Sequence, residues 1–195
     1  PSPYWVSYPD MVALAEGVPV FVPSSPKNKF LISPEDLVKK ITPRSRVLIL
    51  NSPSNPTGCC YSQDQLNSLA QLAVDKGLFV ISDEIYDQLV YDDDKKASLC
   101  SFWEKHPKQV CVCNGLAKSY AMTGWRVGYT LTSPELTKAM SKLQSQSTSN
   151  ICTVAQWAAV AALTGDQSHI RDMGKAFVRR RDLAYDIISK WPGVD

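Results

Sequence analysis

The sequence predicts an α/β fold of three layers, in which a mainly parallel sheet carries helices on both faces. Short apolar runs, typical of buried strands, alternate along the 195 residues with longer amphipathic stretches, typical of helices. The links between them are short, and capping residues mark the starts of several helices. This alternation is typical of parallel strands connected by helices. In such sheets, ligands gather beyond the carboxyl ends of the strands.

The first 41 residues predict two short strands and two helices. We expect residues 4–7 to form the end of a strand and residues 18–22 to form another. Between them, residues 10–17 predict a short helix that a glycine ends. Ser33 and Pro34 predict the next helix, which runs to Ile41, because a hydroxyl cap followed by proline is a typical helix start.

The middle of the chain supplies the expected sheet. Residues 47–50 are a continuous apolar run and predict a strand buried on both faces. Residues 78–81 and 110–113 predict two further buried strands, and residues 125–131 a fourth. The segment 62–65 reads as a capping box, which starts a helix that ends at a glycine before the second of these strands.

The last third predicts helices. Ser133 starts one of them, and an alanine-rich helix over residues 153–163 follows a polar patch. A long amphipathic helix is expected from about residue 170 to 190. We therefore expect a large domain over residues 1–170, incomplete at its N-terminus, and a helix over 171–195 that leads towards a small C-terminal domain outside this sequence.

Composition excludes several classes of function. With 21 basic and 19 acidic residues, the chain has no electrostatic footprint for nucleic acid. No apolar stretch approaches the roughly 20 residues of a membrane span. The six cysteines lack the spacing of zinc sites, so we expect no metal and reduced thiols in a cytoplasmic protein. Two histidines give little support to Ser-His-Asp chemistry.

Chemistry-bearing residues follow three of the predicted strands. Asn55 follows residues 47–50, Asp83 and Tyr86 follow residues 78–81, and Lys118 follows residues 110–113. The carboxyl ends of parallel strands meet at one edge of a sheet, so these side chains should face one crevice.

Lys118 and Arg126 together indicate a phosphate-bearing aldehyde cofactor. A lysine amine with little surrounding water can act as a nucleophile or base near neutral pH. Arginine can hold a phosphate through two parallel hydrogen bonds. An amine beside such an arginine therefore suggests pyridoxal phosphate. Alone, Lys118 could be an ordinary lysine, Arg126 an ion-pair partner and Asp83 a helix cap.

Three motifs, in this order, resemble the class I aminotransferases of the aspartate aminotransferase family (fold type I). They are NSPSNPTG at 51–58, SDEIY at 82–86 and NGLAKSYAMTGWRVGY at 114–129. PYWVSYPDM at 3–11 and LQSQSTSN at 143–150 are similar to the bacterial and plant subgroup that contains aspartate and prephenate aminotransferases. The resemblance covers essentially the whole chain, which would correspond to the middle half of a full-length member. The chain begins with proline, and we expect it to be a segment of such a protein.

The resemblance implies a role for each site residue. Lys118 would form a Schiff base with pyridoxal 5'-phosphate and move the proton between the substrate α-carbon and the cofactor. Asp83 would pair with the pyridine nitrogen, and Arg126 would hold the phosphate. Asn55 and Tyr86 would hydrogen-bond the 3' oxygen of the cofactor.

The resemblance also bears on Trp5 and Gly115. Trp5 would stack on the cofactor ring, with a core tryptophan as the alternative. Gly115 departs from the family, because many members carry a phosphate-binding serine there.

The resemblance implies amino-group transfer between aspartate, or a related acidic amino acid, and a 2-oxo acid such as 2-oxoglutarate, in a homodimer. This segment alone is expected to be inactive. One alternative is a carbon–sulfur lyase or a decarboxylase on the same scaffold. A non-catalytic binding domain is another, and a nucleotide-binding domain is a distant third, because no G-x-G-x-x-G follows a strand.

Overall fold

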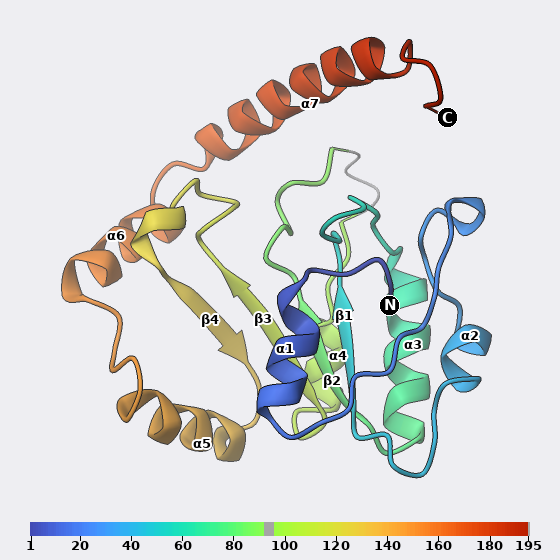
Figure 1. Cartoon of the computed structure of the whole chain (residues 1–195). Helices are drawn as coiled ribbons and strands as arrows, with labels where there is room; N and C mark the ends of the chain where they lie inside the picture. Colours follow the sequence, from blue (N-terminus) through green and yellow to red (C-terminus); the bar gives the residue numbers. More distant parts are fainter. Residues whose placement is uncertain (92–95, 195) are drawn as a thin grey trace.

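A computed structural model describes residues 1–91 and 96–194. In this part of the chain the sheet has four strands in the order β1-β2-β3-β4: β1 (Val47–Asn51), β2 (Phe79–Asp83), β3 (Val110–Gly115) and β4 (Gly128–Leu131). The first three are parallel, and β4 runs antiparallel to β3 (Figure 1). The predicted α/β class and mainly parallel sheet are therefore confirmed. The fourth strand begins later than predicted, because residues 123–125 form a 3-10 turn.

The helices in the described residues are, in chain order, α1 (Ser7–Leu14), α2 (Pro34–Val38), α3 (Gln63–Asp75), α4 (Cys100–Lys105), α5 (Pro134–Ser145), α6 (Thr153–Thr164) and α7 (Ser168–Ile188). Three of them begin at predicted serine caps. The hydroxyl of Ser33 accepts from the Asp36 N–H, that of Ser62 from the Gln65 N–H and that of Ser133 from the Leu136 N–H. The short helix α4 carries no capping side chain, and the sequence did not predict it.

Two of the predicted strands are wrong. Residues 4–7 lead into α1, and residues 18–22 form no ladder. Pairing near them consists of an isolated bridge between Ser2 and Pro23. Val18 and Val20 are 82% and 61% exposed, and only Val22, which is 4% exposed, reaches the core, so most of this apolar run has neither a neighbouring strand nor a burying surface.

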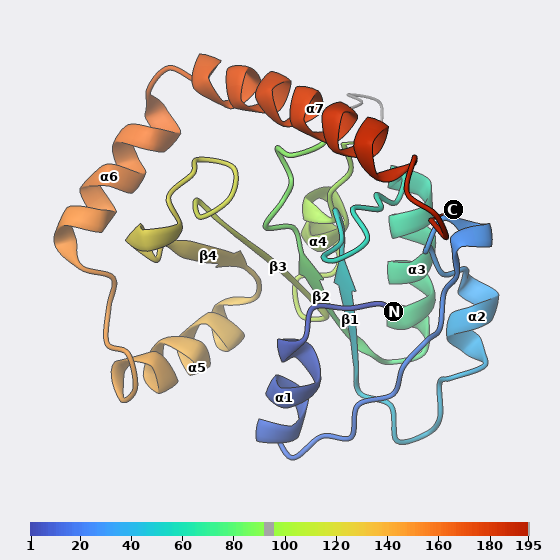
Figure 2. The same ribbon diagram turned by 45° about the horizontal axis from the view of Figure 1, so that its top comes forward.

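One face of the sheet packs on α3 and α4. Its side chains include Leu50, Val80 and Val110, which are fully buried in one cluster with Leu66 of α3 and Phe102 of α4. Helix α1 lies over the other face, so helices cover both faces as predicted (Figures 1 and 2).

The second face is only partly covered. Along β1, Leu48 and Leu50 are buried, whereas Val47 is 50% exposed. The prediction that this strand is buried on both faces is therefore wrong. Its second face instead carries Asn51, which lies beside Asp83 in the β1–β2 register. The open side of the sheet is thus the side that carries polar groups.

Helix α7 lies apart from the sheet, with no buried residue along its length (Figure 2). Within the described residues, no helix is both long enough and apolar enough to cross a membrane. The division of the chain at residue 170 stays a prediction.

Candidate active site

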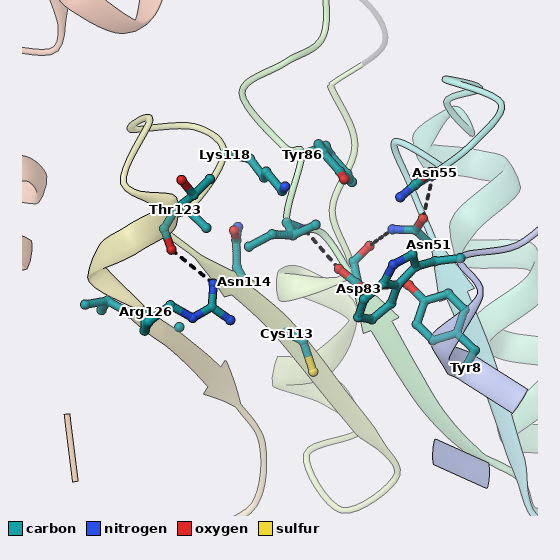
Figure 3. Close-up of a pocket in the computed structure, with 15 residues that line it drawn as sticks. Tyr8, Asn51, Asn55, Asp83, Tyr86, Cys113, Asn114, Lys118, Thr123 and Arg126 are labelled. Carbon is teal, nitrogen blue, oxygen red and sulfur yellow. Dashed lines mark hydrogen bonds between the residues drawn. The ribbon is translucent and has the colours of Figure 1, made fainter. Parts of the chain in front are cut away.

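A pocket of about 470 Å³ opens at the carboxyl ends of β1 and β2 (Figure 3). All the side chains that the sequence singled out for a cofactor line it: Trp5, Asn55, Asp83, Tyr86, Lys118 and Arg126. They come from five separate segments of the chain. The structure therefore brings the predicted residues together in one place.

Asp83, the last residue of β2, is held by two donors. The Tyr8 hydroxyl donates to its Oδ2 at 2.6 Å, and the Ile85 backbone N–H donates to its Oδ1 at 3.1 Å. Burial raises the pKa of Tyr8, and the bond to the Asp83 carboxylate raises it further. Tyr8 therefore stays protonated and keeps donating at neutral pH. The bond to Ile85 has the character of a local turn cap, but the bond to Tyr8 links positions 75 residues apart.

The sequence did not single out Tyr8. The residue lies in PYWVSYPDM, which was used for the resemblance, but nothing in that string shows that a helix would place the phenol against Asp83. Asn51 was also missed as a positioning residue. Its Nδ2 donates to the Asp83 carbonyl at 3.0 Å, and its Oδ1 accepts from the Asn55 N–H at 2.8 Å. Asn51 thereby ties the turn that presents Asn55 to the end of β2.

Lys118 lies in the turn after β3, on the wall of the pocket. Its Nζ is 5.7 Å from the centre of the Tyr86 ring, and Figure 3 shows both side chains at the same edge. The side chain is half-buried. Among the described residues, the amine has no hydrogen-bond or ion-pair partner. An amine in that position is available to a ligand.

Arg126 contributes a fixed cation on the opposite wall. Its backbone is left-handed, with φ of 57°, and its Nη1 donates to the Thr123 carbonyl at 3.0 Å. Within the part of the chain that the structure describes, its other guanidinium N–H groups have no partner, and the residue is exposed. Arg126 and Thr123 thus form one end of the pocket, with Lys118 nearer to Asp83 (Figure 3).

Trp5 also lines the pocket. It is 38% exposed, and its ring meets that of Tyr8 edge to face at 5.4 Å. This exposure contradicts the alternative of a core tryptophan.

At Gly115 the chain has no room for a side chain. An added Cβ would lie 2.7 Å from the Val127 carbonyl oxygen and 3.0 Å from the Gly128 Cα, both backbone atoms. The departure from the family serine therefore matches the close approach of β3 and β4.

Comparison with known proteins agrees with this geometry. The family described as aminotransferase class I and II matches residues 1–194. The chain belongs to this family. It is 44% identical to an aspartate aminotransferase from Geobacillus stearothermophilus, over 99% of this chain and 49% of the relative. It is 43% identical to a probable aspartate/prephenate aminotransferase from Aquifex aeolicus, over 100% and 50%. The predicted resemblance is confirmed.

Solved structures show the same fold. The aspartate aminotransferase from Thermus thermophilus with maleate has a TM-score of 0.87 at 44% identity, over 95% of this chain and 48% of that one. An aromatic aminotransferase from Pyrococcus horikoshii has a TM-score of 0.92 at 35% identity, over 97% and 51%. The chain thus spans about half the length of these relatives.

Proposed function

We propose that this chain forms the cofactor-binding part of an aminotransferase that uses pyridoxal 5'-phosphate. The amino donor would be aspartate or a related acidic amino acid, and the acceptor a 2-oxo acid such as 2-oxoglutarate. The observation that carries the proposal is the convergence of Asp83, Lys118 and Arg126, from three segments, on one pocket. The relatives named aspartate aminotransferase support the choice of donor.

The residues present fit this cofactor. The pocket volume of about 470 Å³ lies within the range typical of small-ligand sites. Arg126 offers free N–H groups to a phosphate, and Lys118 offers an amine to an aldehyde. Asp83 retains lone pairs beyond its two donors, so it can also accept from a pyridinium N–H. The donor set therefore matches a phosphate, an aldehyde and a ring nitrogen.

When bound, the cofactor supplies an electron sink for the negative charge that develops at the substrate α-carbon. Lys118 would hold the cofactor through its amine and would take and return the α-proton as a general base and acid. Asp83 would keep a proton on the ring nitrogen, and Tyr8 would hold that carboxylate in place. Arg126 would anchor the phosphate.

Three further side chains would set the position of the ring. Asn55 and Tyr86 would donate to its 3' oxygen, and Trp5 would cover one face and exclude water. These roles account for the polar groups around the pocket. In the described residues, no group of three or more His, Cys, Asp or Glu side chains could hold a metal ion.

The proposal extends to the organisation of the protein. Residues 1–170 would be the large domain, and residues 171–195 would lead towards a smaller one. The exposed apolar side chains of α7, such as Leu183 and Ile187, agree with such a neighbour. We propose a homodimer as the working state.

The proposal is tested by transfer from aspartate to 2-oxoglutarate in the presence of the cofactor, in a protein that spans the full length of the relatives, because the 195 residues alone are expected to be inactive. Lys118→Ala should lower the rate by at least about 10²–10⁴-fold, as expected for loss of a general base. Lys142→Ala, on the outer helix α5, is the matched control and should keep the parental rate. Equal activity of both variants would refute the role of Lys118.

The same assay separates the alternatives. A carbon–sulfur lyase or a decarboxylase would release ammonia or carbon dioxide and form no glutamate. A non-catalytic binding domain would bind the cofactor but give no product.

A further inference from the structure

Two thiols lie side by side on β3, and one of them lines the pocket. Cys111 and Cys113 are two residues apart and point to the same face, with their Sγ atoms 3.8 Å apart. Cys113 lines the pocket beside Asp83, its partner in the β2–β3 register (Figure 3). Cys111 lies behind it and is 4% exposed. The pair is thus a dithiol in which Cys113 is accessible from the pocket and Cys111 is enclosed.

The hydrogen bond between the two sulfurs shifts the pKa values of the two thiols in opposite directions. Burial and the neighbouring Asp83 carboxylate favour the protonated form of Cys113, whose pKa is raised chiefly by its bond to Cys111. The same bond lowers the pKa of Cys111 to about 7. The lowered pKa gives Cys111 a larger share of the thiolate, which is the nucleophilic form of the side chain.

A disulfide does not suit this position. Residues two apart on an extended strand have Cα atoms about 6.6–6.8 Å apart, which is the upper limit for a disulfide, and the sulfurs would have to approach to about 2.05 Å. The strand cannot readily shorten, because its ladders to β2 and β4 hold it on both sides. A bridging atom that bonds to both sulfurs avoids this requirement.

We propose that Cys111 and Cys113 form a binding site for trivalent organoarsenicals, entered through the pocket. Two S–H bonds and two As–O bonds of a compound R–As(OH)₂ break, two As–S bonds form, and two waters leave. Arsenic stays trivalent, so no oxidant or reductant takes part. The organic group R would extend from Cys113 into the pocket, since Cys111 is enclosed.

The adjacent pair Cys59–Cys60 is the competing dithiol in the described chain. Its sulfurs lie near different backbone carbonyls, with Cys59 Sγ 3.8 Å from the Thr57 oxygen and Cys60 Sγ 3.7 Å from the Gly58 oxygen. Cys100 and Cys152 are exposed and stand alone. A test must therefore distinguish the strand pair from the adjacent pair.

The experiment adds phenylarsenous acid, formed by dissolving phenylarsine oxide, to the protein and measures its intact mass. We expect one phenylarsenic group per chain, removed by 2,3-dimercaptopropanol, and protection of Cys111 and Cys113 from alkylation in peptide maps. Cys111→Ser and Cys113→Ser should each weaken binding by about 10²-fold or more, because the second bond of a linked pair is lost. The double variant Cys59→Ser/Cys60→Ser is the matched control and should bind like the parent.

Loss of the adduct in the control, or its survival in Cys111→Ser and Cys113→Ser, would overturn the proposal. Cys111→Ala is a second variant should serine in the buried position prevent folding, as judged by circular dichroism.

A second arm tests entry through the pocket, and it rests on the proposed function. With pyridoxal 5'-phosphate bound, as judged by its absorbance, adduct formation should slow. An unchanged rate would overturn entry through the pocket. If absorbance shows no bound cofactor, the proposed function fails instead, and the peptide maps still decide where arsenic binds.

Discussion

The bond between Tyr8 and Asp83 offers a direct test of how the site is held together. Tyr8→Phe removes only the hydroxyl and leaves the ring to pack against Trp5. The lost bond is short, at 2.6 Å, and its acceptor is a carboxylate. Hydrogen bonds to charged groups contribute roughly 1.5–3 kcal/mol. Tyr8 is only half-buried and Asp83 keeps the Ile85 donor, so we expect a loss near the lower limit, about 1.5 kcal/mol.

The measurement is the free energy of unfolding in urea at pH 7 for the parent and for Tyr8→Phe. Tyr185→Phe is the matched control, because Tyr185 is 74% exposed on α7 and should change stability by less than about 0.5 kcal/mol. An equal effect of the two substitutions would refute the reasoning.

The dependence on pH gives the same test a second readout. The folded-state pKa of Tyr8 is raised above its ordinary value of 10.0. A group with a raised pKa stabilises the fold below its unfolded pKa, and that contribution is lost as pH rises towards the folded value. The difference between parent and Tyr8→Phe should therefore be constant from about pH 7 to 9 and shrink above about pH 10. A difference that stays constant above pH 10 would contradict a tyrosine hydroxyl bound to a carboxylate.

Three further predictions concern the sheet and its polar edge. In a protein that spans the full length of the relatives, Asp83→Asn should leave the cofactor bound but slow single-turnover reaction with aspartate by about 10²-fold or more, because an amide cannot stabilise a protonated ring nitrogen. A parental rate in this variant would show that Asp83 only caps the turn after β2. Gly115→Ala should cost about 1–3 kcal/mol in thermal or urea unfolding, since its Cβ would meet the Val127 carbonyl, whereas Gly124→Ala, with open space around it, should cost little. Burial raises the pKa of Glu84, so its contribution to stability is present at low pH and is lost as pH rises through that raised value. Glu84→Gln should therefore flatten the pH dependence of stability above about pH 4.5. An unchanged profile would contradict a raised pKa of Glu84 in the folded state.

Local chemistry explains why much of the fold could be predicted. Serine caps at Ser33, Ser62 and Ser133 set three helix starts through contacts within four residues, which a sequence displays directly. The apolar runs of β1 to β3 are similarly local. By contrast, residues 18–22 have the composition of a strand but do not form one. A strand needs a neighbouring strand to pair with, and the composition of the run does not indicate whether such a neighbour exists.

The same distinction applies to the site. Asn55, Asp83, Tyr86 and Lys118 follow strands, so the rule for parallel sheets was enough to place them at one edge. The link from Tyr8 to Asp83 could not be predicted, because it depends on how α1 crosses a sheet that begins some 40 residues later in the chain.

The exposed face of β1 has the same explanation. A continuous apolar run reports its own composition, whereas burial depends on which surface covers it. Here α1 covers only part of that face, and the pocket opens beside it (Figure 1).

The central claim is that Lys118 is the amine that holds the cofactor. The most direct measurement incubates the protein with pyridoxal 5'-phosphate, reduces it with borohydride and maps the labelled peptides by mass spectrometry. Reduction fixes the cofactor to the amine that holds it, so the label should lie on Lys118 alone and should be absent from Lys118→Ala. Label spread over several surface lysines, or retained in Lys118→Ala, would contradict the account.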